Sequence, residues 1–469
     1  MAITQLVWLR NDLRLDDHPA IAQAQQQGEV AVVVCLTPEQ WDEHHESPAK
    51  GSLRLKLIQT LRQQAHELNI PCHVLPLRRF SDCPNALLTL CQEQNYQQVW
   101  WQNELPVHEA QRDDNTENHL REHNIECQRF APDLIVSQPV LNQQGQPFKV
   151  FTPFYKRWLA TLSANVQSPY DLPNKQTQGE ALPNEFVIPS EQSSYREDLW
   201  PADYQAIREK LWHFCHTKEA LYDELRDFPA KPNTSLLSPY LALGAIGPRA
   251  CLEAIIYSAS QDNRDWHASV WLKELAWRDF YKQLMGFFPD LSKSLPFKPE
   301  TVNVIWNNNE AGFKAWCEGN TGFPIVDAAM RQLNQTGWMH NRLRMIAASF
   351  LTKLLLIDWR KGEAYFMSKL IDGEFAANNG GWQWSASTGC DAAPYFRVFN
   401  PTRQSERFDP DGTFIKKFIP ELKSIPAKNI HNPSSAIRDQ CNYSEPVIDY
   451  KLARQHAIAA FENLKKENE

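Results

Sequence analysis

Several patterns that would assign the protein to a common class are missing from its 469-residue sequence. No window is apolar over the length of a membrane span, and the N-terminus lacks the charged and apolar segments of a secretory signal. The ten cysteines form no C-x-x-C pair and no Cys/His spacing typical of zinc. We therefore expect a soluble intracellular protein with reduced thiols and no metal site.

The sequence also lacks an excess of positive charge. Its formal net charge is −8, which does not indicate a nucleic-acid-binding protein. The charge is unevenly distributed, however, because ten basic residues oppose six acidic ones between Met330 and Arg407. Such a segment is either a solvated helix face or a surface that contacts phosphates, and both interpretations stay open.

Aromatic residues, by contrast, are plentiful: they make up 11% of the sequence and include 16 tryptophans. So many tryptophans indicate either a large helical core or a use beyond filling volume, such as stacking or electron transfer. The chain is longer than one hydrophobic core usually supports, so we expect two or three domains.

The first third of the chain alternates between strand patterns and helical patterns. Runs of β-branched and aromatic residues begin at Gln5, Val30, Pro71 and Gln97, and a helical pattern of leucines begins at Ser52. This alternation predicts a parallel, doubly wound sheet. No G-x-G-x-x-G motif follows the first strand. The loop there, RNDLRLDDHPAI, alternates in charge, so we expect no dinucleotide in the usual crevice and charges that pair on the surface.

The middle of the chain has the composition of a linker. From about Ala164 to Trp200 it is rich in Pro, Gln, Ser and Asn. The preceding segment KVFTPFYKRW, from Lys149 to Trp158, either contacts phosphate or packs the domains together, and we favour packing. After Trp200 nearly every pattern is helical. The predicted fold is therefore α/β plus all-α, with a Rossmann-like parallel sheet, a long linker and a helical domain.

The densest cluster of polar and aromatic residues lies between Gly322 and Pro401. In IDGEFAANNGGWQW, acidic, amide and tryptophan side chains flank a Gly-Gly pair, which we interpret as a turn where backbone can approach a ligand. This mixture suits a pocket for a planar heterocycle, although each residue alone is equally at home in a core or on a surface.

Two further segments carry candidate polar groups. A helix from Ser269 to Phe288 sets Glu274 among aromatic side chains, so its carboxyl group is either buried with a partner or faces a pocket. Three hydroxyls at a helix start either bind a phosphate or cap the helix, and capping is the default; they belong to Thr234, Ser235 and Ser238.

Long motifs then give a specific resemblance. WLKELAWRDFY, TGFPIVDAAMRQLNQTGWMHNRLRMIAASFL, IDWRKGEAYF, IDGEFAANNGGWQWSASTGCDAAPYFRVFNP and the opening LVWLRNDLRLDDHPAI resemble bacterial class I cyclobutane pyrimidine dimer DNA photolyases. The resemblance covers the whole chain. It implies an α/β antenna domain at 1–135, a linker at 136–200, and a helical FAD- and DNA-binding domain at 201–469. It also implies light-driven electron transfer from reduced, anionic FAD to a flipped-out dimer in DNA.

The resemblance further implies a set of FAD-binding residues. Asn378 is expected near flavin N5, and Arg344 with Asp372 is expected to form a buried ion pair beside the flavin ring. The full set is Tyr222, Thr234, Ser235, Leu237, Ser238, Trp271, Glu274, Trp338, Asn341, Arg344, Asp372, Glu374 and Asn378. Glu374 stands where the family often has aspartate, and Leu236 where it often has arginine.

The resemblance implies a dimer cavity and an electron path as well. Glu274 and Asn378 are expected to act in catalysis, Glu274 by stabilising the dimer radical anion. The cavity and the flanking phosphates are assigned to Arg226, Trp277, Asn341, Arg342, Met345, Trp384 and Arg397. The chain of tryptophans that photoreduces the flavin is assigned to Trp382, Trp359 and Trp306.

An antenna chromophore is implied too, and we favour methenyltetrahydrofolate, with a deazaflavin or a flavin as alternatives. Its contacts are expected at His44, His108, Glu109 and Lys293, and His108 replaces a common asparagine. The expected partner is DNA that contains pyrimidine dimers, bound by a monomer in the bacterial cytoplasm.

Three competing functions stay open. A cryptochrome, a signalling flavoprotein of the same fold, often carries a long C-terminal extension, whereas this chain ends in a plain helical pattern. Repair of the pyrimidine-pyrimidone photoproduct calls for a histidine pair, where this sequence has Asn341 and Met345. A non-catalytic nucleic-acid-binding module would leave Asp372 and Asn378 without a role.

Overall fold

The structure is a computed structural model that describes residues 4–177 and 195–467. The chain divides into two compact units. Unit 1 comprises Met1–Ala220, Ser235–Pro289 and Ile371–Ala376, and unit 2 comprises Leu221–Thr234, Asp290–Leu370 and Ala377–Glu469. Residues 178–194, in the middle of the predicted linker, lie outside the described residues, and the predicted domain boundaries stay a prediction.

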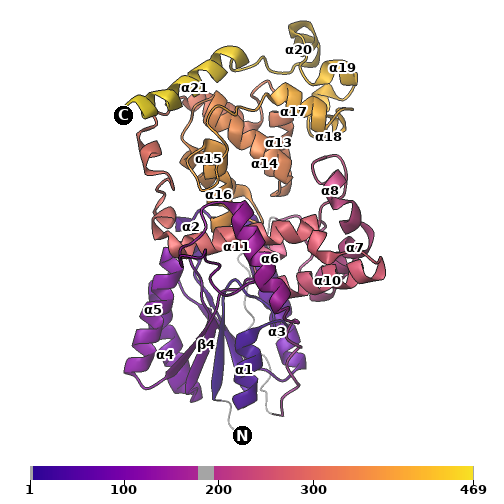
Figure 1. Ribbon diagram of the computed structural model, residues 1–469. Helices are drawn as coiled ribbons and strands as arrows, with labels where there is room; N and C mark the ends of the chain where they lie inside the picture. Colours follow the sequence, from indigo (N-terminus) through magenta and orange to yellow (C-terminus); the bar gives the residue numbers. More distant parts are fainter. Residues whose placement is uncertain (1–3, 178–194, 468–469) are drawn as a thin grey trace. The chain divides into compact units, whose positions relative to one another are not determined.

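Unit 1 contains a five-stranded parallel sheet in the order β3-β2-β1-β4-β5. The strands are β1 (Gln5–Leu9), β2 (Val30–Leu36), β3 (Cys72–Pro76), β4 (Gln98–Gln102) and β5 (Glu126–Phe130). All five residues of β1 are buried, because the central strand is covered on both faces. Figure 1 shows α1 (Pro19–Gln27) and α3 (Pro48–Glu67) on one side of the sheet and α4 (Cys83–Gln94) and α5 (Val107–Glu122) on the other. The predicted parallel, doubly wound sheet is confirmed.

The rest of unit 1 is mainly helical. Its longer helices are α6 (Phe151–Ala164), α7 (Tyr204–Thr217), α10 (Pro248–Gln261) and α11 (Val270–Phe287), and its short ones are α2 (Pro38–Glu43) and α9 (Ser238–Ala242). Helix α6 begins inside the segment predicted as a linker. It buries Phe154 and Trp158, and the Trp158 indole donates a 2.9 Å hydrogen bond to Asp279 on α11. The aromatic residues of KVFTPFYKRW thus pack within unit 1.

Among the residues that the structure describes, the regular elements of unit 2 are all helices. Its helices include α8 (Tyr222–Leu225), α12 (Glu310–Glu318), α13 (Pro324–Thr336), α14 (Asn341–Ser349), α15 (Trp359–Lys369), the part of α16 (Phe375–Ala386) after Ala376, α17 (Pro401–Phe408), α18 (Thr413–Phe418) and α21 (Tyr450–Glu467). One hydrophobic core contains residues of α13, α14, α15, α16 and α18. It includes the fully buried Trp316, Trp359 and Trp382. Within the described part of the chain, no helix is both long and apolar enough to cross a membrane.

The charged loop after β1 differs from its prediction. We expected its charges to pair on the surface, but Arg10, Asp12 and Arg14 are buried, and Arg14 is 0% exposed. Arg14 forms a 2.8 Å ion pair with Asp133, and the resulting attraction lowers the pKa of the Asp133 carboxyl group in spite of its burial. The surface prediction was wrong because this loop, which connects the central strand β1 to α1, is buried within unit 1. A buried side chain stays charged only if an opposite charge or hydrogen bonds compensate for the loss of water.

Candidate functional site

Helix α11 carries the acid and the aromatic residues that were predicted together. Ser269 caps its first turn by accepting a hydrogen bond from the Leu272 amide at 3.1 Å. Trp271 is buried and contacts Phe214 edge-on, whereas Glu274 and Trp277, one turn apart, are half-buried. The helix therefore presents a carboxyl group and an indole side by side on its partly open face.

Trp277 is supported from behind by another ring. Phe151, the first residue of α6, stacks on it with centroids 3.6 Å apart and planes 7° apart. Tyr281 flanks the indole at 5.4 Å. Such stacking fixes the orientation of the indole and leaves its remaining surface to contact a ligand. Sequence reasoning gave Phe151 only a packing role, and the only signal for its support of Trp277 was the aromatic density of KVFTPF.

The hydroxyls at the start of α9 do not all act as helix caps. The hydroxyl of Ser238 donates to Asp372 at 2.6 Å, and the N-cap residue of α9, Leu237, makes no side-chain cap. The hydroxyl of Ser235 accepts a hydrogen bond from the Leu237 backbone amide at 3.4 Å. Ser238 is therefore the first residue of α9 and not its N-cap, and its hydroxyl proton is held by a carboxylate in a charge-assisted hydrogen bond. Leu236 adopts a left-handed conformation with φ 54°.

In unit 2, α14 begins a second group of predicted residues. Arg342 forms a 2.6 Å ion pair with Asp227 and lies over the ring of Phe408. Arg344 donates to the Met339 carbonyl at 2.8 Å. Asn341 is exposed and Met345 half-buried, one turn apart. Asp227 was not predicted, although it directly follows Arg226 in the sequence.

Other predicted residues of unit 2 are at least partly accessible. The Arg226 guanidinium lies over the Tyr222 ring, 5.4 Å from its centroid. Trp338 and Trp384 are half-buried, and Arg397 is exposed. These side chains can therefore reach a ligand at the surface of unit 2.

The Gly380-Gly381 pair is not the turn that the sequence suggested. Helix α16 runs through it, since the buried Trp382 and a 3.0 Å bond from Gln383 to Asn379 offset the cost of glycine in a helix. A Cβ at Gly381 would meet no atom within 4 Å, so open space adjoins the helix there. This space lies one turn after Asn378, and a ligand there could approach the backbone closely.

Asn378 and Asn379 both bind Glu363 on α15. The Asn378 side-chain amide donates to the Glu363 carbonyl at 3.1 Å, and that of Asn379 donates to the Glu363 carboxyl group at 2.8 Å. Burial raises the pKa of Glu363 to about 7. Glu363 was missed because an acid in a helix next to basic residues resembles a surface residue.

The three tryptophans of the predicted electron path differ in exposure. Trp382 is 2% exposed and contacts Phe366 edge-on at 4.9 Å, and Trp359 is 1% exposed with the Arg360 guanidinium over its ring. Trp306 is half-buried and lies edge-on to Phe461. A path from buried to accessible tryptophans suits electron transfer toward solvent, and its assignment stays a prediction.

The predicted antenna residues of unit 1 contact one another. His44 Nε2 and His108 Nδ1 are hydrogen-bonded at 3.0 Å, and Glu109 lies 3.5 Å from His44 Nδ1. Burial, and then the charges of Glu104 and Glu46, raises the pKa of Glu109 to about 7. The histidine at 108 thus provides a partner for His44. Lys293, in unit 2, is exposed and pairs with Asp290.

Charged side chains pair with one another near the carboxyl ends of β1 and β4. Arg112 binds Glu104 and Asp113 at 2.7 Å each, and Arg10 lies 3.4 Å from Asp113. This is the switch point of the sheet, where a doubly wound fold usually binds its ligand. Among the described residues, no group of three or more His, Cys, Asp or Glu could hold a metal ion.

Comparisons with known proteins agree over the full length of the chain. Residues 5–173 match the model of the DNA photolyase family, and residues 271–463 match that of the FAD binding domain of DNA photolyase. The sequence is 43% identical to a deoxyribodipyrimidine photo-lyase of Vibrio cholerae, over 98% of this chain and 100% of the relative. It is 41% identical to the enzyme of that name from Escherichia coli, over 99% of both chains. The crystal structure of a class III photolyase from Agrobacterium tumefaciens aligns with a TM-score of 0.89 at 32% identity, over 99% of this chain and 98% of that one.

Proposed function

The chain belongs to the DNA photolyase family, and we propose that it repairs cyclobutane pyrimidine dimers in DNA by using light to drive an electron transfer. The observation that carries the proposal is the pair on α11: a half-buried carboxyl group, Glu274, one turn from an indole, Trp277, that Phe151 holds in place. A flat apolar lesion stacks on such an indole, while the acid binds its polar edge. When bound, FAD in its reduced anionic form supplies the electron that opens the cyclobutane ring.

The chain's own residues fit a flavin. Open space adjoins α16 at Gly381, and Asn378 is oriented by its bond to Glu363. We assign FAD binding to Ser235, Leu237, Ser238, Trp271, Glu274, Asp372 and Glu374 in unit 1, and to Tyr222, Thr234, Trp338, Asn341, Arg344 and Asn378 in unit 2. The bond from Ser238 keeps the Asp372 carboxylate in one orientation, which favours binding of a ligand in one pose.

The dimer is bound out of the helical stack, since its reacting bonds are inaccessible inside a duplex. Trp277 and Trp384 supply stacking surfaces, and Asn341, Arg342 and Met345 contact the lesion. Arg226 and Arg397 neutralise phosphates beside it. Glu274 stabilises the charge that develops on the pyrimidine during electron transfer. Asp227 is a positioning residue, because it holds the Arg342 guanidinium.

Trp382, Trp359 and Trp306 conduct an electron inward when the flavin is oxidised. The burial of Trp382 and Trp359 excludes water from the path. Because Trp306 is accessible, an external reductant can return the electron that Trp306 has given up.

For the antenna we favour a folate over a deazaflavin or flavin. The supporting observation is that three of the residues expected to contact it, His44, His108 and Glu109, lie within contact distance of one another. His44, His108, Glu109 and Lys293 are assigned to this chromophore. We also infer that the protein acts as a monomer in the bacterial cytoplasm, where its DNA substrate is found.

The test is repair itself. The purified protein, with its flavin photoreduced under anaerobic conditions, is mixed with an oligonucleotide that carries one thymine dimer. Recovery of thymine absorbance under blue or near-ultraviolet light, and none in the dark, is the expected result. A bound, photoreducible flavin without recovery would favour a cryptochrome-like light sensor instead.

A further inference from the structure

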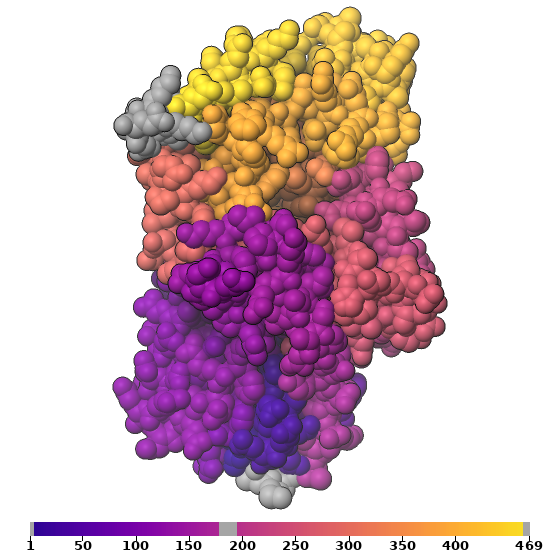
Figure 2. All heavy atoms as spheres, in the orientation of Figure 1, coloured from indigo at the N-terminus to yellow at the C-terminus, as the bar shows by residue number. Residues whose placement is uncertain are grey.

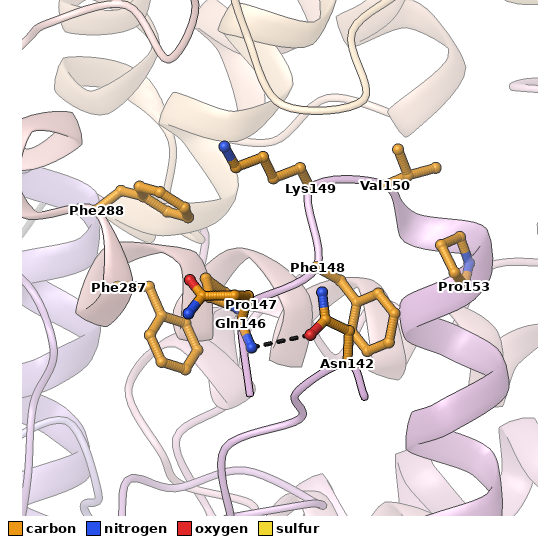
Figure 3. A pocket seen from close by; sticks show the side chains of 9 residues that line it. All are labelled: Asn142, Gln146, Pro147, Phe148, Lys149, Val150, Pro153, Phe287 and Phe288. Carbon is orange, nitrogen blue, oxygen red and sulfur yellow. Dashed lines mark hydrogen bonds between the residues drawn. The ribbon is translucent and has the colours of Figure 1, made fainter. Parts of the chain in front are cut away.

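Unit 1 contains a surface pocket that the proposed repair chemistry does not use. It has a volume of about 550 Å³ and lies between the turn that precedes α6 and the end of α11 (Figure 3). Its nine lining residues are Asn142, Gln146, Pro147, Phe148, Lys149, Val150, Pro153, Phe287 and Phe288. In Figure 2 the purple segment that includes the start of α6 lies on the face toward the viewer.

One wall of the pocket is a preformed turn. The side-chain carbonyl of Asn142 accepts hydrogen bonds from the backbone amides of Gln144 and Gln146, both at 2.9 Å. The backbone of Asn142 and Gln146 is joined by a further 2.9 Å bond, and Gly145 supplies the left-handed conformation, with φ 72°, that the turn requires. A ligand would therefore meet this wall in a fixed shape, at little cost in conformational entropy.

The opposite wall is aromatic and the rim is basic. Figure 3 shows Phe287 and Phe288 on one side and Phe148 on the other. The Lys149 ammonium group lies 5.9 Å from the centroid of Phe288. The lining includes one cation and no acidic residue, and two further basic residues, Lys156 and Arg157, are exposed on α6. Flat apolar rings beside cations are what a base and its phosphate require.

We propose that this pocket binds a nucleotide that flanks the lesion, by stacking the base on Phe288 and pairing its phosphate with Lys149. The inference rests on the proposed function, because only a protein that binds DNA at Trp277 presents the flanking strand here. Under this proposal the segment KVFTPFYKRW has two roles. The rings of Phe151, Phe154 and Trp158 pack inward, and its basic residues face the DNA strand that flanks the lesion.

The spacing along α11 supports this assignment. Trp277 and Phe288 are eleven positions apart, which corresponds to about 16 Å at the helical rise of about 1.5 Å per residue. A strand of B-form DNA covers that distance in about five nucleotides, and a straightened strand in fewer. Phe151, which stacks on Trp277, also follows Lys149 and Val150 directly, so the pocket adjoins the support of the proposed cavity wall.

The test compares dark binding to single-stranded oligonucleotides that carry one thymine dimer. One has no flank, one is extended by eight nucleotides on the 5′ side, and one is extended equally on the 3′ side. The flavin-loaded wild type should bind one extended substrate more tightly than the unextended one. Phe288→Ala should weaken that binding about tenfold, in keeping with the loss of one base stack, and leave the dissociation constant of the unextended substrate unchanged.

Lys149→Ala tests the phosphate contact independently. The slope of log K against log salt for the sensitive extended substrate should fall by about 0.7, the value for one single-strand phosphate. Lys175→Ala, which removes an exposed lysine elsewhere in unit 1, and Phe288→Tyr, which keeps an aromatic ring, are the matched controls and should behave as wild type.

Wild-type affinities for both extended substrates in Phe288→Ala and Lys149→Ala would overturn the proposal. So would an equal loss on the unextended substrate, which would indicate a general change in the fold. A wild-type protein that does not prefer the dimer to undamaged thymines would instead contradict the proposed function, and the two failures are thereby distinguished.

Discussion

At the scale of the residue, the structure shows which neighbouring side chains hold the proposed functional side chains in place. Phe151 fixes Trp277, Asp227 fixes Arg342, and Ser238 fixes Asp372. In each pair the supporting residue belongs to another part of the chain than the residue it holds. A local pattern carries no information about such a contact, so these partners could not be predicted from spacing.

Trp277→Ala is predicted to weaken dark binding of dimer-containing DNA by about 1–3 kcal/mol, because it removes one stacking surface. Titration by fluorescence anisotropy measures the change. Tyr257→Ala, which removes an exposed aromatic ring from α10, is the control and should bind as wild type does. Equal affinities of Trp277→Ala and wild type would remove Trp277 from the dimer cavity.

Glu363 is predicted to make stability depend on pH. Its folded-state pKa of about 7 exceeds the ordinary value of 4.5, so the folded chain holds its proton more tightly than the unfolded chain does. The free energy of unfolding should therefore fall as pH rises from about 4.5 through 7, by about 3 kcal/mol at most.

Glu363→Gln removes the titrating proton and keeps an oxygen that can accept from Asn379. Urea unfolding of both proteins from pH 5 to pH 8 measures the effect. The difference in unfolding free energy, variant minus wild type, should grow with pH, and a constant difference would show that Glu363 does not titrate in this range.

At the scale of the element, α15 and α16 pack so closely that side-chain volume decides their stability. A Cβ at Gly362 would overlap the indole of Trp382, whereas a Cβ at Gly381 would enter open space. Gly362→Ala is therefore predicted to destabilise the protein by about 1–3 kcal/mol through overpacking. Gly381→Ala, assayed without flavin, should be neutral or stabilising, because alanine is the better helix former. Thermal unfolding of the pair tests this, and equal losses would contradict the packing account.

Trp306→Phe is predicted to slow the photoreduction of oxidised flavin at least tenfold, since phenylalanine is much harder to oxidise than tryptophan. Absorbance of the flavin under continuous illumination, with a thiol as reductant, measures the rate. Trp212→Phe changes another half-buried tryptophan and should leave the rate unaffected. An unchanged rate in Trp306→Phe would mean that the electron enters by another path.

At the scale of the whole molecule, the sequence was sufficient for the fold class but not for several local features. Alternating strand and helix patterns predicted the parallel sheet, because each pattern reflects burial that the sheet imposes on every strand. The helix through Gly380 and Gly381 escaped prediction, since tertiary contacts of Trp382 and Asn379 override the low helix propensity of glycine. The burial of Arg14 escaped it too, because its partner Asp133 is distant in sequence.

The candidate residues came mainly from long motifs whose residues also have chemistry suited to a flavin and a lesion. The contacts that hold these side chains in place could be identified only from the three-dimensional structure. The pocket beside Phe288 is a case in point, since its walls come from segments more than a hundred residues apart in the sequence. The same basic and aromatic segment, KVFTPFYKRW, was compatible with packing and with phosphate contact, and the contacts of Phe151, Phe154 and Trp158 show that its aromatic side chains pack within unit 1.

The most direct measurement compares two lesions under identical light. Matched duplexes, one with a single cyclobutane thymine dimer and one with a pyrimidine-pyrimidone photoproduct, are illuminated with the reduced protein, and restored thymines are counted by chromatography. Recovery from the cyclobutane dimer alone is the predicted result, since neither Asn341 nor Met345 can transfer the proton that the other lesion requires. Recovery from the pyrimidine-pyrimidone photoproduct, or from neither lesion, would contradict the account.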